Sequence, residues 1–158
     1  MITINVGRTH SCGPLPSLPL ERAAAHVLAG EGRRQAKIDI ILLRDAEIRR
    51  INKKFLSHDY VTDVITFPIE DAPFLEGEIY IGAGIARRQA REYGVSFPEE
   101  LIRLVVHGIL HLCGFDDAGS AAAAMRRAED AYVARFTRRS PGKKKSTNQG
   151  VKKWISFN

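Results

Sequence analysis

Apolar and polar residues alternate through residues 1–6, where Ile2, Ile4 and Val6 fall on one side. A period of two predicts a half-buried strand. More continuously apolar stretches at 37–43, 63–67 and 77–81 predict three further strands. We expect Pro68 to end the strand at 63–67, because proline has no backbone N–H to donate to a sheet.

Apolar residues spaced three or four apart predict five helices between and after these strands. The first covers residues 20–29 and ends at Gly30. The second follows Asp45 as its cap and turns Ile48, Ile51 and Phe55 toward the core. The third covers 85–93, with Gly94 at its end.

The last two helices begin at serines. Ser96 and Glu99 form a capping box before an apolar run from Leu101 to Leu112, and Ser120 is the expected cap of the final helix. The run 101–112 has little polar face, so it must be buried. The order of elements predicts an α+β fold, in which a small mixed sheet of about four strands packs with about five helices around a buried central helix.

Two histidines interrupt the buried run. His107 and His111 are four residues apart, which places both imidazoles on one helix face. Gly114 suits a left-handed helix end, and Asp116 or Asp117 beyond it can return a carboxylate toward them. Such a set is an open three-ligand metal site, with a fourth position for water or substrate.

The same pair also has a simpler interpretation, as core imidazoles hydrogen-bonded to the backbone. Cys113 lies two residues after His111 and points to another face, so we interpret it as a small buried apolar residue.

Composition is that of a globular protein: 158 residues, 44% hydrophobic and 27% charged. The length fits one domain, expected over residues 1–137. Two cysteines do not make a disulfide framework. No apolar run reaches membrane-spanning length, so we expect a cytoplasmic protein with no membrane partner.

The net charge of +6 is concentrated at the C-terminus. Residues 138–158 hold seven basic and no acidic residues, which leaves 17 basic and 18 acidic residues in 1–137. This segment is expected to be a disordered basic tail, either simply solvated or a phosphate-binding arm.

Two predicted helices carry basic faces. A face of this kind is usually solvated, but four cations without an intervening acid, as in 49–54, also make a plausible track for phosphates. The residues of the two faces, which become RNA-binding candidates through the family resemblance below, are Arg49, Arg50, Lys53, Lys54, Arg87, Arg88 and Arg91.

Several segments resemble one known family. HGILHLCGFDD (107–117) is similar to the pattern H-G-x-L-H-L-x-G-[FY]-D-H of the YbeY family, bacterial metal-dependent endoribonucleases of rRNA maturation. INKKF and DYVTDVITFP in 51–68 resemble that family's L-N-x-x-F-R and D-x-P-T-D-V-L-S-F-P. GEIYI, ARRQAREYG, and Met125 with Glu129 match further blocks in the same order, over about residues 37–136.

The resemblance implies one zinc ion bound by His107, His111 and Asp117. The family's third ligand is histidine, so Asp117 is a departure. A carboxylate also binds zinc, and an oxygen ligand makes manganese more competitive. Asp116 matches the family's own Asp and is expected to be a turn residue or to contact a ligand.

A second departure concerns catalysis. The family's arginine after N-x-x-F is replaced by Leu56, which cannot bind a phosphate or stabilise charge. Lys53, Lys54 or an arginine of 85–93 is the expected replacement, and Lys54 is our catalytic candidate. Thr62, Asp63, Thr66 and His58 are expected in the cleft or in turn and strand positions. Among these four residues His58 is the acid–base candidate, because histidine is the residue type that ordinarily titrates near neutral pH.

The predicted function is a zinc-dependent endoribonuclease specific for single-stranded RNA. The resemblance implies a role in small-subunit rRNA maturation and ribosome quality control, with rRNA or the small ribosomal subunit as partner. The alternative is a metal-stabilised RNA-binding ribosome-assembly factor with little catalysis. A zinc peptidase is disfavoured, because Gly108 stands where H-E-x-x-H enzymes have their general base.

Overall fold

The computed structural model describes residues 1–9 and 12–137. Its sheet consists of β1 (Ile2–Arg8), β2 (Ala36–Leu43), β4 (Leu75–Gly82) and β3 (Val64–Glu70), in that spatial order. β1, β2 and β4 run parallel, and β3 pairs antiparallel with β4 at the end of the sheet. The expected mixed four-stranded sheet is therefore confirmed.

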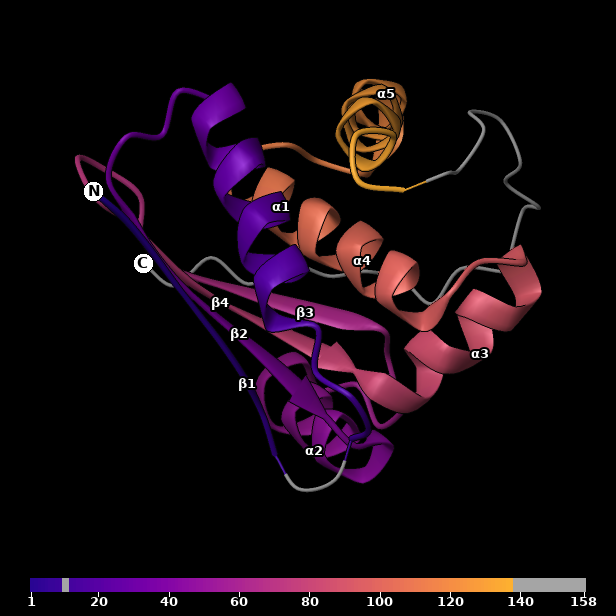
Figure 1. Cartoon of the computed structure of the whole chain (residues 1–158). Coiled ribbons are helices and arrows are strands. Elements are labelled where there is room, and N and C mark those ends of the chain that lie inside the picture. Colours follow the sequence, from indigo (N-terminus) through magenta and orange to yellow (C-terminus); the bar gives the residue numbers. More distant parts are fainter. Residues whose placement is uncertain (10–11, 138–158) are drawn as a thin grey trace.

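Five α-helices and one 3₁₀ turn surround the sheet. They are α1 (Ser17–Gly30), α2 (Asp45–Leu56), α3 (Ala83–Tyr93), α4 (Phe97–Leu112), η1 (Gly119–Ala121) and α5 (Ala122–Val133). Figure 1 shows α1 and α4 on one face of the sheet, α5 beyond α4, and α2 on the opposite face. The predicted α+β class and element order are confirmed.

Alternation along the strands divides the core into two clusters. Ile38, Ile40 and Leu42 of β2 belong to the larger cluster, which also holds the buried residues of α1 and α4. Leu43 belongs to a smaller cluster with Ile48 of α2. Successive strand side chains point to opposite faces, so one strand supplies both layers.

Most side chains of α4 are buried, because the helix contacts α1, α3, α5, β3 and β4. The capping box is confirmed: Ser96 Oγ accepts from the Glu99 N–H at 3.2 Å, and Glu99 accepts from the Ser96 N–H at 2.8 Å. Gly114 has φ of 100°, which ends the helix region as expected.

Four local predictions were wrong. β3 continues through Pro68 to Glu70, because the strand lies at the sheet's end and its register shifts between Pro68 and Glu70. Ser120 is not the cap of α5, since the 3₁₀ turn supplies the helix entry and Ala121 precedes it. Asp45 is the first helical residue rather than the cap, and Glu47 accepts from the Arg44 N–H at 2.9 Å.

Phe55 is the fourth. Its side chain is 45% exposed, and its ring makes an edge contact with Phe67, at 5.4 Å between centroids. Ile48, two stripe positions earlier in α2, is fully buried. Phe55 lies in the last turn of the helix and is outside the smaller cluster, which Ile51 and Leu56 do contact.

The predicted basic tail, residues 138–158, lies outside the described residues. Within residues 1–9 and 12–137, no helix combines the length and apolar character needed to cross a membrane.

Gly108 allows α4 to approach the sheet closely. A Cβ there would lie 2.9 Å from Cδ1 and 3.0 Å from Cγ2 of Ile79, whose side chain is fully buried. We expect Gly108→Val to lower the free energy of unfolding by about 2 kcal/mol or more, because overpacking forces the buried neighbours apart. Denaturant unfolding measures this loss.

Gly7→Val is the matched control. A Cβ at Gly7 meets no atom within 4 Å, and β1 is a strand, where valine is favoured. Equal losses of unfolding free energy in Gly108→Val and Gly7→Val would contradict the role of Gly108 as the contact point between α4 and the sheet.

Candidate metal centre

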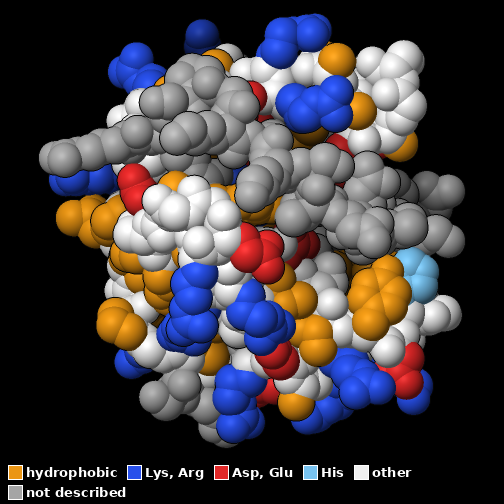
Figure 2. Space-filling model, turned by 90° about the vertical axis from the view of Figure 1, so that its right-hand side faces the viewer, with side chains coloured by type: hydrophobic (Ala, Val, Ile, Leu, Met, Phe, Trp, Pro, Cys, Tyr) orange, Lys and Arg blue, Asp and Glu red, His pale blue; other side chains and the backbone are white. Residues whose placement is uncertain are grey.

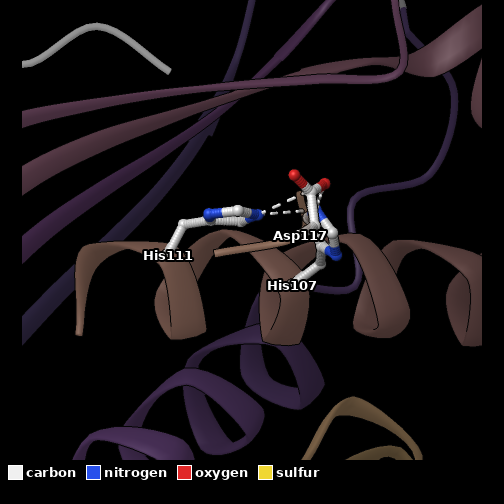
Figure 3. Close-up of side chains that lie close together, drawn as sticks. All are labelled: His107, His111 and Asp117. Carbon is white, nitrogen blue, oxygen red and sulfur yellow. Dashed lines mark hydrogen bonds and ion pairs between the residues drawn. The ribbon is translucent and has the colours of Figure 1, made fainter. Parts of the chain in front are cut away.

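The two histidines of α4 lie one turn apart and face each other. Their ring centroids are 4.6 Å apart, and their Nε2 atoms are separated by 3.1 Å. His107 is 3% exposed, so its imidazole is almost wholly removed from solvent. Both rings point away from the helix axis toward the same space (Figure 3).

Asp117 completes the group from the segment after the helix. Its Oδ2 lies 3.6 Å from Nε2 of His107 and 3.6 Å from Nε2 of His111. The turn at Gly114 reverses the chain, and Asp116 Oδ1 then accepts from the Ala118 N–H at 3.0 Å. Asp116 is thus a turn residue, and the bend it supports brings Asp117 over the imidazoles (Figure 3).

These three side chains could hold a metal ion. Their ligand atoms all lie within 4.8 Å of one another, the only such group of three within residues 1–9 and 12–137. Two imidazole nitrogens and one carboxylate oxygen are a donor set typical of catalytic zinc sites with an open fourth position. The set also suits harder divalent ions, so the donors alone do not select one metal.

The remaining nitrogen of His107 is also engaged. Nδ1 lies 2.7 Å from Oε2 of Glu129, which is 3% exposed and comes from α5. A carboxylate behind a ligand histidine orients the ring and makes its metal-facing nitrogen more basic. The sequence blocks match Glu129 to the family, but they do not show that it contacts His107.

Asp63 and Gln89, which both lie in the sequence blocks that resemble the family, contact each other. Asp63 precedes β3, and its Oδ2 accepts from Gln89 of α3 at 3.3 Å while its Oδ1 accepts from the Val64 N–H at 2.8 Å. Asp63 is 8% exposed and Thr66 is 2% exposed. Asp63 therefore joins the start of β3 to α3.

The candidate catalytic residues His58 and Lys54 do not belong to the metal-binding group. His58 follows α2, stacks on Tyr60 with 5.2 Å between centroids, and has its Nδ1 3.0 Å from the Tyr60 hydroxyl. Lys54 Nζ lies 5.2 Å from the Phe55 ring centroid. α2 packs on the face of the sheet opposite α4 (Figure 1).

The predicted RNA-binding cations differ in their environments. Arg49 and Lys53 both pair with Asp59, at 2.8 and 3.4 Å, and Arg88 pairs with Asp45 at 3.2 Å. Arg87 donates to the Cys12 carbonyl and lies over the Phe97 ring. Asp59 lies after the end of α2, so the charge pattern along the α2 face does not predict its pairing with Arg49 and Lys53.

Arg50, Lys54 and Arg91 make no ion pair among the described residues and are exposed. Figure 2 views the side of the molecule near α3, where Lys and Arg side chains are spread among acidic and apolar ones. The Lys and Arg side chains visible in this view do not form one continuous patch.

Comparison with known proteins identifies the family. The YbeY endoribonuclease model matches residues 18–137. The chain belongs to the YbeY family. The endoribonuclease YbeY of Chlorobium phaeovibrioides is 40% identical over 75% of this chain and 81% of that protein. The endoribonuclease YbeY of Chlorobaculum tepidum is 44% identical over 70% of this chain and 81% of that protein.

A solved structure agrees with the fold. The solution structure of TM1509 from Thermotoga maritima matches with a TM-score of 0.62 and 28% identity, over 92% of this chain and all of that one. The expected YbeY resemblance is therefore confirmed.

Cys113 does not join the metal-binding group. Burial raises the pKa of its thiol to about 11, so the thiolate that binds metals is scarce at neutral pH. We expect Cys113→Ala to keep the metal content of the purified protein, whereas His111→Ala loses most of it. Elemental analysis of dialysed samples measures the metal content of both variants. A lower metal content in Cys113→Ala would indicate that the cysteine is a ligand.

Proposed function

We propose that this YbeY-family chain is a metal-dependent endoribonuclease that cleaves single-stranded RNA during maturation of small-subunit ribosomal RNA. The observation that carries the proposal is the convergence of His107, His111 and Asp117 within 4.8 Å, in a chain whose relatives are named endoribonuclease YbeY. This role, with two free cysteines, is the basis for expecting a cytoplasmic location.

Zinc is the proposed metal, and manganese is the proposed competitor because Asp117 supplies an oxygen. A bound zinc ion supplies a Lewis acid and a water whose pKa is lowered to about 7. His107, His111 and Asp117 would hold it from one side, which leaves a position for the scissile phosphate. The burial of His107 excludes water from that side of the site.

His58 is the proposed proton-transferring residue, with Lys54 as a catalytic cation. The Tyr60 hydroxyl engages Nδ1 of His58, so Nε2 is the nitrogen left to exchange a proton. Arg49, Arg50, Lys53, Arg87, Arg88 and Arg91 are proposed to contact the RNA backbone together with Lys54. Among them, the cations without a carboxylate partner are expected to contribute most.

Cleavage of an unstructured RNA oligonucleotide tests the enzyme. We expect His111→Ala and Asp117→Ala to lower the rate at least about a hundredfold, because each removes a ligand. His26→Ala is the matched control, since His26 lies in α1 against the Tyr132 and Phe136 rings. Equal residual cleavage in all four proteins would indicate a contaminating nuclease and contradict the proposal.

RNA affinity at several salt concentrations tests the basic face of α2. We expect the double variant Arg50→Ala/Lys54→Ala to weaken binding more than Arg49→Ala/Lys53→Ala. Both remove two positive charges, but Asp59 already neutralises part of the second pair. Each lost phosphate contact should reduce the slope of log affinity against log salt by about 0.7.

Unchanged salt slopes in both double variants would exclude the α2 face as an RNA-binding surface. A larger loss of RNA affinity in Arg49→Ala/Lys53→Ala than in Arg50→Ala/Lys54→Ala would indicate that Asp59 releases Arg49 and Lys53 when RNA binds.

One observation favours the second candidate function, a metal-stabilised assembly factor. Leu56 packs against the smaller core cluster of Leu43, Ile48, Ile65 and Phe67, so the family's arginine position is here an apolar packing position. RNA binding that survives in the metal-ligand variants, with no cleavage by the wild type, would support this second function.

A further inference from the structure

A chain of buried charges lies directly behind His107. Glu129 of α5 contacts His107 Nδ1 through Oε2 at 2.7 Å, and Arg103 of α4 through Oε1 at 3.3 Å. Arg103 also donates to Glu100, from Nη2 at 2.5 Å and from Nε at 2.9 Å. Glu100, Arg103 and Glu129 are 0%, 8% and 3% exposed.

Such a cluster is costly to bury. Each ion removed from water loses its solvation, which pairing only partly repays. Two carboxylates and one guanidinium leave one negative charge in excess. That charge is adjacent to His107, because both Arg103 and His107 contact the same carboxylate.

The contact also fixes the proton on the imidazole. The contact with Arg103 favours the ionised form of Glu129, and an ionised carboxylate only accepts hydrogen bonds, so Nδ1 of His107 is then the donor. Nε2 then carries the lone pair, and Nε2 is the atom that faces His111 and Asp117. The alternative tautomer would place a lone pair against the carboxylate and a proton in the metal position.

We propose that Glu129, held in place by Arg103, is a positioning residue of the metal centre, which keeps His107 in the Nδ1–H form and thereby raises metal affinity. The inference rests on the proposed metal function of His107, His111 and Asp117. It gives α5, which supplies no metal ligand, a direct part in the site.

The competing interpretation is purely structural: the ion pairs only fasten α5 to α4. α5 has a second polar anchor, the Tyr132 hydroxyl, which donates to Glu31 at 2.6 Å. Tyr132→Phe removes that anchor without touching His107, so it is the matched control for weakened docking of α5.

The test compares Glu129→Gln with Tyr132→Phe and the wild type. Zinc affinity, measured by competition with a chelator, is expected to fall 10- to 100-fold in Glu129→Gln and to stay within about threefold in Tyr132→Phe. Equal losses in the two variants, or no loss in Glu129→Gln, would overturn the proposal.

A second measurement needs neither metal nor a variant. Nitrogen-15 NMR of the metal-free wild type at pH 8 distinguishes the imidazole tautomers, and His107 is expected to carry its proton on Nδ1. A proton on Nε2 would overturn the proposal even if Glu129→Gln fails to fold.

Failure of this inference is distinguishable from failure of the proposed function. If the wild type binds zinc and His111→Ala does not, while Glu129→Gln matches the wild type, the metal centre stands and the positioning role falls. If the wild type binds no divalent metal, the metal centre falls as well.

Discussion

The burial of α4 is the constraint on which the rest of this structure depends. The helix touches the sheet through Gly108, where the lack of a side chain allows Ile79 to approach, and other helices cover its remaining sides. A polar group buried in such a position costs about 1–3 kcal/mol unless it is hydrogen-bonded. Every polar residue that α4 carries inward must therefore have a partner, and those partners make up the site.

The partners come from separate parts of the chain. His107 meets Glu129 of α5 on one ring nitrogen and faces Asp117 with the other. Arg103 connects Glu129 with Glu100. A rigid helix thus supplies two imidazoles and the Glu100 carboxylate, while the turn after it supplies Asp117 and α5 supplies Glu129. His107 and Glu129 therefore belong both to the candidate metal site and to the packing of α5 on α4.

The two faces of the sheet have different parts in this arrangement. The face under α1 and α4 carries the larger core and the metal-binding group, and the face under α2 carries the smaller core with Leu56. The basic residues of α2 lie on the second face, across the sheet from the histidines (Figure 1).

The sequence alone determined most of the fold, because its patterns are local. Alternation identified β1, and apolar runs identified the other three strands. The capping box identified the start of α4, and the spacing of His107 and His111 placed both on one face. Gly114 indicated the turn that returns Asp117, since few other residues adopt a left-handed backbone.

Tertiary structure decided what depends on contacts between distant residues. Asp59 pairs with both Arg49 and Lys53, Phe55 stays 45% exposed at the end of α2, and β3 passes through Pro68 because it is the end strand. The Glu129–His107 contact spans 22 residues, and no periodicity along the chain reports such a pair. Helix and strand periods record which face is buried, whereas the partner of a buried charge depends on how separate elements pack.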